Sequence, residues 1–280
     1  MAPTDHSDPS MPPPPSGEHG AGAPASHGAG AYAGEAAIHS VDVTEYGAER
    51  DGVRQQMDRR LFMQLLVYRT TGEKSPNKAL KHAGKMLGDE GVGSVLYEDL
   101  SDPRSFAVLT WSENPAHFVE RVRPVLGHKD LADLELRSDF TMTGRTYSSG
   151  HEPDLEYWLL RRPVETALNK DWPWAIWYPL RRGGAFEMLD GREQGRILKE
   201  HGILGRAYGA KDLAHDIRLA CQGLDTHDND FVIGLIGREL HPLSHVVQSM
   251  RKTRQTREFL VNLGPFFVGH VAVRNPDEAD

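Results

Sequence analysis

His201 and Tyr178 are the two residues whose surroundings suggest chemistry. His201 lies in KEHGILGRAYG (199–209), directly before a glycine, and Tyr178 lies in DWPWAIWYPLRR (171–182), before two arginines. Imidazole is a common metal ligand, and a phenol beside guanidinium groups suits a planar, anionic, aromatic ligand. These two segments therefore indicate where a flat, charged ligand would bind.

A structural explanation also exists for each segment. A histidine in the last turn of a helix, followed by glycine at C′, interacts favourably with the helix dipole and needs no ligand. Period-two alternation places four large side chains on one strand face, where they can simply fill a core: Trp172, Trp174, Ile176 and Tyr178. Local sequence favours the structural account of His201, whereas the arginines after Tyr178 favour a ligand.

Composition narrows the class of protein. The net charge of −8 and the pI near 6.0 give no general attraction to nucleic acid or anionic lipid. The single cysteine, Cys221, excludes an internal disulfide and multi-cysteine metal centres. No apolar run approaches the roughly 18 to 20 residues that cross a bilayer. We expect a soluble, cytoplasmic protein that neither binds nucleic acid nor inserts into a membrane.

Common catalytic motifs are absent from the sequence. It contains no GxxxxGK[ST], no GxGxxG after a strand, no HExxH and no GxSxG. Cys221 lies within a predicted strand and is expected to be a small buried residue. The acidic stretch GLDTHDND (223–230) lacks the spacing of a calcium loop. Nucleotide, zinc-protease and serine-hydrolase chemistry are therefore unsupported.

The chain divides into a tail and two similar halves. Residues 1–40 are rich in Pro, Gly and Ala and are expected to be disordered. In residues 41–150 the pattern predicts strand 59–72, helix 75–91, strands 92–100 and 105–113, and helix 114–127. In residues 151–280 it predicts strand 172–182, helix 190–202, strands 213–225 and 230–239, helix 241–256 and strand 264–273.

This order indicates a duplicated α+β fold. FAVLTWSENPAHFVERV (106–122) aligns with FVIGLIGRELHPLSHVV (231–247), with proline opening the second helix each time. Each half is expected to be a ferredoxin-like repeat, with an antiparallel sheet covered by helices on one face. Two such sheets that run on into each other can form a paired barrel, with a ligand cavity between sheet and helices.

Five segments resemble, in order, the C-terminal half of the chlorite dismutase superfamily of heme proteins, most closely its coproheme decarboxylases. They are WYPLRR, ILKEHGILGRAYG, GLD followed by DFVIGL, VVQSMRKTRQTREF and GPFFVGHV, and they fall within residues 172–272. The resemblance implies two ferredoxin-like repeats forming a heme-binding dimeric α/β barrel. It also implies a ring-shaped homo-oligomer, often a pentamer.

The resemblance implies a role for five residues, and the aromatic strand adds Trp174 as a sixth. His201 matches the axial ligand of the heme iron, and Tyr178 matches the tyrosine that forms a radical and attacks a propionate. Arg182, Arg251 and Thr256 fall where basic and hydroxyl residues hold propionates, and Trp174 is expected to line the cofactor. The implied activity is hydrogen-peroxide-dependent oxidative decarboxylation of Fe-coproporphyrin III (coproheme) to heme b in heme biosynthesis.

Three departures qualify this resemblance. Ala214 stands 13 residues after His201, where chlorite dismutases place an arginine, so chlorite dismutation is not expected. The segment RRPVETALNKDWPW (161–174), where a distal histidine is expected, contains none, so the peroxide-activating residue is unassigned; Arg161, Arg162 and His215 are candidates. Gln255 lies near the position of the family's carboxylate partner for the axial imidazole.

Two alternatives therefore stay open. The first is a heme-binding or heme-transfer protein of the same fold, with only incidental peroxidase activity. The second is a related barrel that binds no porphyrin.

Overall fold

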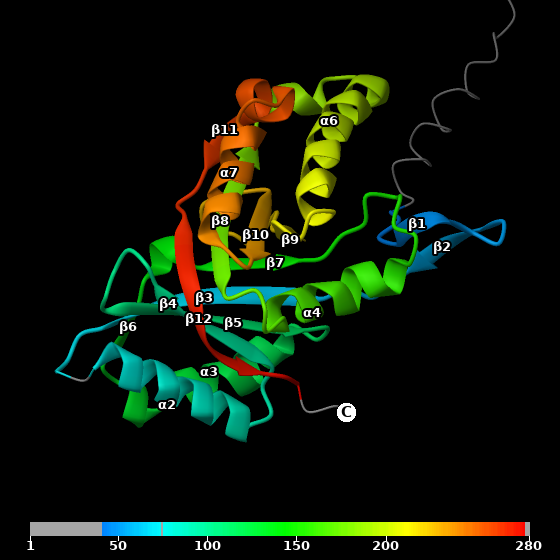
Figure 1. Ribbon diagram of the computed structural model, residues 1–280. Coiled ribbons are helices and arrows are strands. Elements are labelled where there is room, and N and C mark those ends of the chain that lie inside the picture. Colours follow the sequence, from blue (N-terminus) through cyan, green and yellow to red (C-terminus); the bar gives the residue numbers. More distant parts are fainter. Residues whose placement is uncertain (1–40, 74, 278–280) are drawn as a thin grey trace, which may run out of the picture. The chain divides into compact units, whose positions relative to one another are not determined.

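Two β-α-β-β-α-β units make up most of the described chain. The computed structural model describes residues 41–73 and 75–277, and the described residues from Thr44 onward form one compact unit. The first repeat consists of β3 (Phe62–Thr70), α2 (Pro76–Asp89), β4 (Ser94–Asp99), β5 (Ser105–Ser112), a helical turn (Phe118–Val122) continued by α3 (Arg123–Leu126), and β7 (Met142–Arg145). The second consists of β8 (Trp174–Arg182), α6 (Gly191–Gly209), β9 (His215–Ala220), β10 (Phe231–Gly237), α7 (Leu240–Met250) and β12 (Phe267–Asn275) (Figure 1).

Further elements lie before, between and within these repeats. They are β1 (Glu45–Arg50), β2 (Val53–Met57), β6 (Leu134–Leu136), α4 (Arg162–Leu168) with the helical turn before it (Tyr157–Arg161), α5 (Gly184–Glu187), a helical turn at Gln255–Phe259 and β11 (Leu260–Leu263), with single turns at Lys129–Leu131 and Ser138–Phe140. The predicted tail, residues 1–40, lies outside the described residues. The predicted boundary between residues 150 and 151 stays a prediction.

Both repeats have the same strand order. In each, the fourth strand pairs with the first, the first with the third, and the third with the second: β7-β3-β5-β4 and β12-β8-β10-β9. This antiparallel order is ferredoxin-like, which confirms the predicted fold class.

The two sheets join into a closed eight-stranded barrel. β4 pairs with β12 along six residue pairs, and β7 meets β9 at Arg145 and Ala220. Closure matters because an open sheet edge exposes unpaired backbone groups. It also divides every strand into side chains that point into the barrel and side chains that point out.

Strand β8 shows this division at the residues of interest. Ala175 and Trp177 belong to the cluster inside the barrel, whereas Ile176 and Tyr178 belong to a cluster beneath α7. The predicted alternation is therefore correct from Trp174 onward. Trp172 lies before the strand begins and packs against the interior cluster instead.

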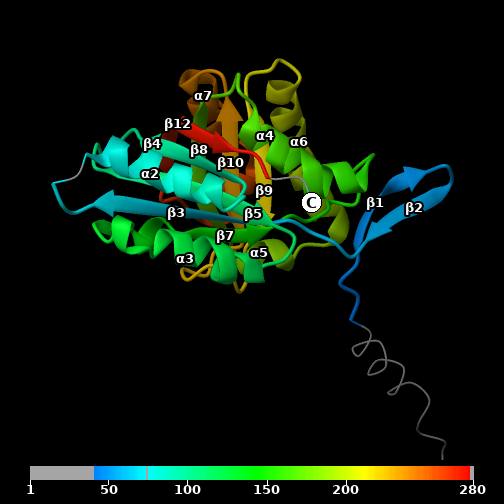
Figure 2. The same ribbon diagram turned by 90° about the horizontal axis from the view of Figure 1, so that it is seen from below.

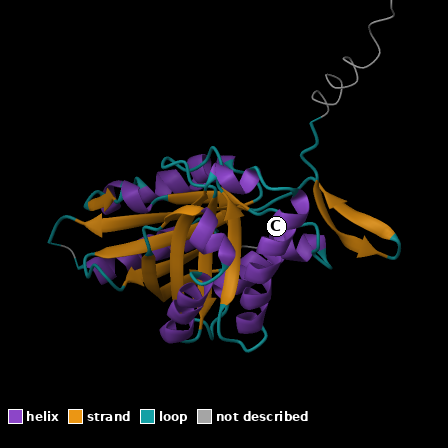
Figure 3. Cartoon of the chain, turned by 90° about the horizontal axis from the view of Figure 1, so that it is seen from above, coloured by secondary structure: helices purple, strands orange, loops and turns teal. Residues whose placement is uncertain are grey.

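The helices cover opposite sides of the barrel. α2 and α3 pack on β3, β4 and β5 of the first repeat, and Figure 2 shows them in front of those strands. α6 and α7 lie over β8, β9 and β10 of the second repeat, next to each other (Figures 1 and 3). Each repeat thus keeps its own helical layer.

Besides β6, β7, α5 and β11, two further elements are absent from the sequence prediction. The first is the β1–β2 hairpin, in which Asp51 and Gly52 have φ angles of 54° and 78° between the paired residues Arg50 and Val53. Two positive φ angles define the tight turn for which Asp-Gly is the usual sequence, so a local signal was present. The second is α4, whose preceding leucines join the interior cluster of the barrel.

Gly234 is predicted to be intolerant of a side chain. A Cβ at Gly234 of β10 would lie 2.6 Å from the Trp177 ring, which is fully buried. Gly234→Ala should lower the free energy of unfolding by about 1–3 kcal/mol, because overpacking displaces a rigid ring. Urea denaturation measures this. Gly195→Ala in α6, where nothing lies within 4 Å, is the control and should not destabilise; equal effects would contradict the packing argument.

Candidate functional site

A large cavity lies between the outer face of the second repeat and its helices. Its volume is about 620 Å³. Its apolar wall comes from β8, β10, β11 and α7, through Leu180, Ile233, Leu235, Val246, Val247, Met250, Leu260 and Leu263. The predicted residues Tyr178, His201, Arg251 and Thr256 all line it. The structure therefore brings four of the six predicted site residues together.

Trp174 and Arg182 lie outside this lining. Trp174 packs edge-on against His270 with 4.8 Å between ring centroids. The Arg182 guanidinium lies 4.2 Å from the Phe186 ring centroid and pairs with Glu187 at 3.6 Å. Their proposed contacts with a ligand stay predictions, and the structure shows both side chains engaged elsewhere.

His201 lies in the interior of α6. The helix begins after Asp190, whose carboxylate accepts hydrogen bonds from the Arg192 and Glu193 backbone N–H groups, and it continues to Gly209. The predicted helix end at Gly202 is therefore wrong. Because His201 is two turns away from the real C-terminus, stabilisation by the helix dipole does not explain it.

Three glycines leave space on the cavity side of α6. Gly202, Gly205 and Gly209 line the cavity together with His201. A Cβ at Gly205 would meet only the Met250 methyl, at 3.6 Å. Glycine within a helix costs about 0.5–1 kcal/mol relative to alanine, so three on one face require a compensating reason. Space for a ligand is such a reason, and their spacing of three and four residues is the sequence signal for it.

The His201 imidazole is neutral and lacks a partner within the described chain. Burial lowers its pKa, and the charge of Arg218 lowers it further. Its Nδ1 is buried without a hydrogen-bond partner, as is Oε1 of Gln255. The two residues come from adjoining segments, since the Arg254 backbone N–H donates to Glu200 at 3.0 Å. The imidazole Nδ1 of His201 can donate and the amide Oε1 of Gln255 can accept, and the two lie on neighbouring elements.

Tyr178 presents a protonated phenol to the cavity. Its side chain is 7% exposed and stacks on Phe266 with 4.7 Å between ring centroids. Burial raises its pKa, and the nearby Asp216 carboxylate raises it further, while Arg251 opposes both. None of the described residues hydrogen-bonds its hydroxyl, which stays available to a ligand.

Four arginines line the cavity, and two of them are already paired. The Asp216 carboxylate accepts hydrogen bonds from Arg162 at 2.9 Å and pairs with Arg218 at 3.0 Å. Burial alone would raise the Asp216 pKa, but Arg218 and Arg162 hold it below its usual value. Arg206 and Arg251 form no ion pair with any described residue. Sequence reasoning missed Arg206, which lies between the cavity glycines Gly205 and Gly209 on α6.

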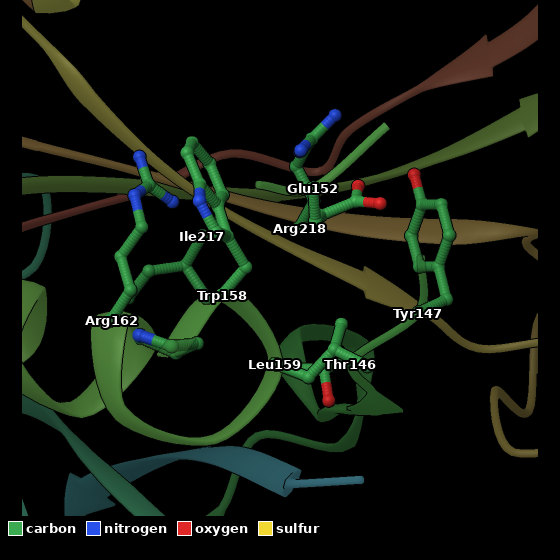
Figure 4. A pocket seen from close by; sticks show the side chains of 9 residues that line it. Thr146, Tyr147, Glu152, Trp158, Leu159, Arg162, Ile217 and Arg218 are labelled. Atoms are coloured by element: carbon green, nitrogen blue, oxygen red, sulfur yellow. The ribbon is translucent and has the colours of Figure 1, made fainter. Parts of the chain in front are cut away.

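A smaller pocket adjoins this arginine cluster. Figure 4 shows Trp158, Arg162, Arg218 and Tyr147 around it. Its volume of about 20 Å³ suits a single water molecule. Glu152 lines both pockets, and its carboxylate accepts hydrogen bonds from Ser149 and from the His151 backbone N–H. The loop before α4 therefore forms part of the cavity wall.

Two histidines join the lining besides His201. His215 at the start of β9 bonds Asp212 through Nε2 at 2.8 Å and stacks on Trp172 with 3.7 Å between ring centroids. His151 comes from the loop before α4. Neither lies in the segment where the sequence comparison places a distal histidine. Of the other two candidates, Arg162 lines the cavity, whereas Arg161 lies over Tyr157.

The position that distinguishes chlorite dismutases also faces this space. Ala214 lines the cavity and is 6% exposed, so a methyl group stands where an arginine is expected in those enzymes.

Cys221 is buried one residue beyond the end of β9, and its thiol donates to the Asn229 carbonyl. It is thus the expected small buried residue.

A known protein family matches the part of the chain that forms the cavity. Residues 138–272 match the chlorite dismutase family model. That segment contains α6, α7 and most of the strands that surround the cavity. No curated protein matches the sequence.

The fold of this chain matches the fold of solved chlorite dismutase structures. A heme-binding protein from Thermus thermophilus has a TM-score of 0.61 and 18% identity, with 77% of this chain and 92% of that chain covered. Chlorite dismutase from Candidatus Nitrospira defluvii, in complex with imidazole, has a TM-score of 0.60 and 15% identity, with 78% and 93% covered. Identities this low show a common fold.

Two further findings concern the described residues only. No cluster of three or more His, Cys, Asp or Glu side chains is arranged to hold a metal ion there. No helix among them is long and apolar enough to cross a membrane.

Asp216 should stabilise the cavity wall in a pH-dependent manner. Its folded pKa is lowered, so its stabilising contribution is present above the unfolded value of about 3.9 and is lost as pH falls through the folded pKa. Asp216→Asn should cost about 1 kcal/mol at neutral pH, because two arginines lose a charged partner that is itself partly exposed to solvent. Urea denaturation between neutral pH and pH 3 should show the difference from wild type shrinking below pH 4. A difference that grows in acid would contradict this assignment.

Proposed function

We propose that the protein binds an iron porphyrin in this cavity and uses hydrogen peroxide to decarboxylate coproheme to heme b. The observation that carries the proposal is the meeting of neutral His201, protonated Tyr178 and unpaired Arg206 and Arg251 on the lining of one largely apolar cavity. A single histidine suffices as protein ligand where a macrocycle supplies the other four nitrogens. The glycine face of α6 leaves room for a flat ring beside His201.

The arginines support a porphyrin with several carboxylates. Coproheme carries four propionates and heme b carries two, and a buried carboxylate is costly unless it is paired. Arg206 and Arg251, which pair with no carboxylate in the described part of the chain, can serve this purpose, with the Thr256 hydroxyl in the same lining. Arg218 pairs with Asp216 through Nε, and its remaining N–H groups can donate to a further propionate.

Tyr178 is the residue that we assign to the chemistry. The bound iron porphyrin and peroxide together supply the oxidising power. Tyr178, protonated at the outset, gives up an electron and its proton, then takes a hydrogen atom from the propionate β-carbon. Carbon dioxide leaves and a vinyl group remains. Each propionate loses two electrons and one peroxide takes up two, forming two waters, so conversion to heme b needs two turnovers.

His215 is our candidate for proton transfer to and from peroxide. Its Nε2 is occupied by Asp212, which leaves Nδ1 as the ring nitrogen able to accept a proton. A carboxylate that orients an imidazole in this manner is a common arrangement for a general base. Ala214 offers no cation to hold chlorite, so we propose no chlorite dismutation.

One titration series tests the proposal. Wild-type protein is titrated with coproheme, the Soret band is recorded, and peroxide is then added while porphyrin products and carbon dioxide are measured. Tyr178→Phe should bind coproheme but form no heme b, because the phenol hydrogen is lost. His201→Ala should lose the spectrum of a histidine-ligated iron porphyrin.

The outcomes of this series separate the alternatives. Simple bleaching of bound porphyrin by peroxide in wild type would favour a heme-binding or heme-transfer protein, and unchanged turnover in Tyr178→Phe would exclude Tyr178. A protein that stays colourless with both coproheme and heme would reject the porphyrin site.

The glycine face provides a matched test of where the ligand lies. Gly205→Leu places a branched side chain in the cavity and should weaken coproheme binding by at least tenfold, about 1.4 kcal/mol. Gly195→Leu, on the exposed part of the same helix, makes the same chemical change away from the cavity. Equal affinities for the two variants, measured by Soret titration, would place the ligand elsewhere.

A further inference from the structure

A second tyrosine of the cavity, Tyr208, has an imidazole within hydrogen-bond distance of its hydroxyl. It lies seven residues after His201 on α6 and also lines the cavity. At 1.5 Å per residue the two positions are about 10 Å apart along the helix axis. The Tyr208 hydroxyl lies 2.6 Å from Nδ1 of His245 and 3.0 Å from the Ser249 hydroxyl, both on α7.

The contrast with Tyr178 is chemical. Oxidation of a phenol to a neutral radical removes one electron and one proton, so a base within hydrogen-bond reach favours it. Tyr178 is buried, and none of the described residues accepts a hydrogen bond from it. Tyr208 is half-buried, and the imidazole it contacts is exposed to solvent. The pair therefore links the cavity wall to the surface.

We propose that Tyr208 and His245 form a proton-coupled redox pair, which makes Tyr208 a second oxidisable residue of the cavity. This inference rests on the proposed function for its oxidant, the oxidising equivalent that peroxide supplies. The Tyr208 O–H bond breaks, its electron passes to the oxidised site in the cavity, and its proton passes to Nδ1 of His245. A one-electron donor in solvent then returns the electron, and His245 returns the proton.

Such a pair gives the oxidising equivalent a second destination. When no propionate is within reach of Tyr178, as after the last decarboxylation, an equivalent that stays in the cavity would attack the porphyrin or the protein. Transfer through Tyr208 moves it to the surface, where a small reductant can remove it. The position of His245 on the outer side of α7 suits this role.

The first arm of the test uses the protein without porphyrin. Photogenerated tris(bipyridine)ruthenium(III) oxidises the protein in the presence of a nitroso spin trap, and peptide mapping measures the adduct on Tyr208. His245→Gln should lower this adduct roughly tenfold or more, because a positioned proton acceptor is lost. His241→Gln is the matched control, since its ring lies 6.0 Å from His245 on the same helix and does not bond Tyr208. Equal labelling in the two variants overturns the pair.

The second arm uses coproheme-loaded Tyr178→Phe protein and peroxide. Trapped radical on Tyr208, lost in Tyr178→Phe/Tyr208→Phe, supports the proposal; labelling confined to other residues overturns it. Failure of the proposed function would appear separately, as absence of coproheme binding in the titration. The first arm still decides the redox pair in that case.

Discussion

Helix α6 is held by polar contacts along one side rather than by a packed apolar face, and the cavity depends on this. Only Ile197 among its 19 residues is fully buried. The helix is instead tied to the turn at Gln255–Phe259, where Arg254 pairs with Glu193 and donates its backbone N–H to Glu200. A helix anchored by such contacts can lie over a sheet without filling the space beneath it. The glycines preserve that space, and His201 is then carried on a rigid element above an apolar surface.

The two repeats differ in how their helices pack on the sheet, and the closed barrel makes this difference possible. The first repeat fills the space between its sheet and helices with side chains from α2, α3 and the facing strands. The second repeat has the same strand order, yet its helices leave a cavity. Because the closed sheet and its interior core stabilise both halves, one helical layer can be given up for ligand binding. The fold and the site therefore place separate demands on the sequence.

The fold could be predicted from the sequence more fully than the site, because the two depend on different features of the sequence. Alternation in β8 and the repeated element order depend on burial, which the spacing of apolar residues reveals. The two repeats, and the strand face shared by Ile176 and Tyr178, could therefore be predicted. The end of α6 was misplaced because Gly202 reads as a helix terminator when considered locally. Only the cavity explains glycine at that position. Arg206, His151 and Tyr208 come together through tertiary packing, and no local pattern marks them.

The cavity wall also draws on the segment between the two repeats. His151, Glu152 and Trp158 precede β8, and Gln55 of the β1–β2 hairpin bonds the backbone carbonyls of Glu152 and Pro153. A ligand in the cavity therefore binds the state in which the second repeat and the connecting loop are folded and the hairpin is bonded to that loop. By linkage, its binding free energy adds to the stability of that state as a whole. Ligand occupancy would then report on completed folding, so partly folded chains would remain empty and more susceptible to proteolysis.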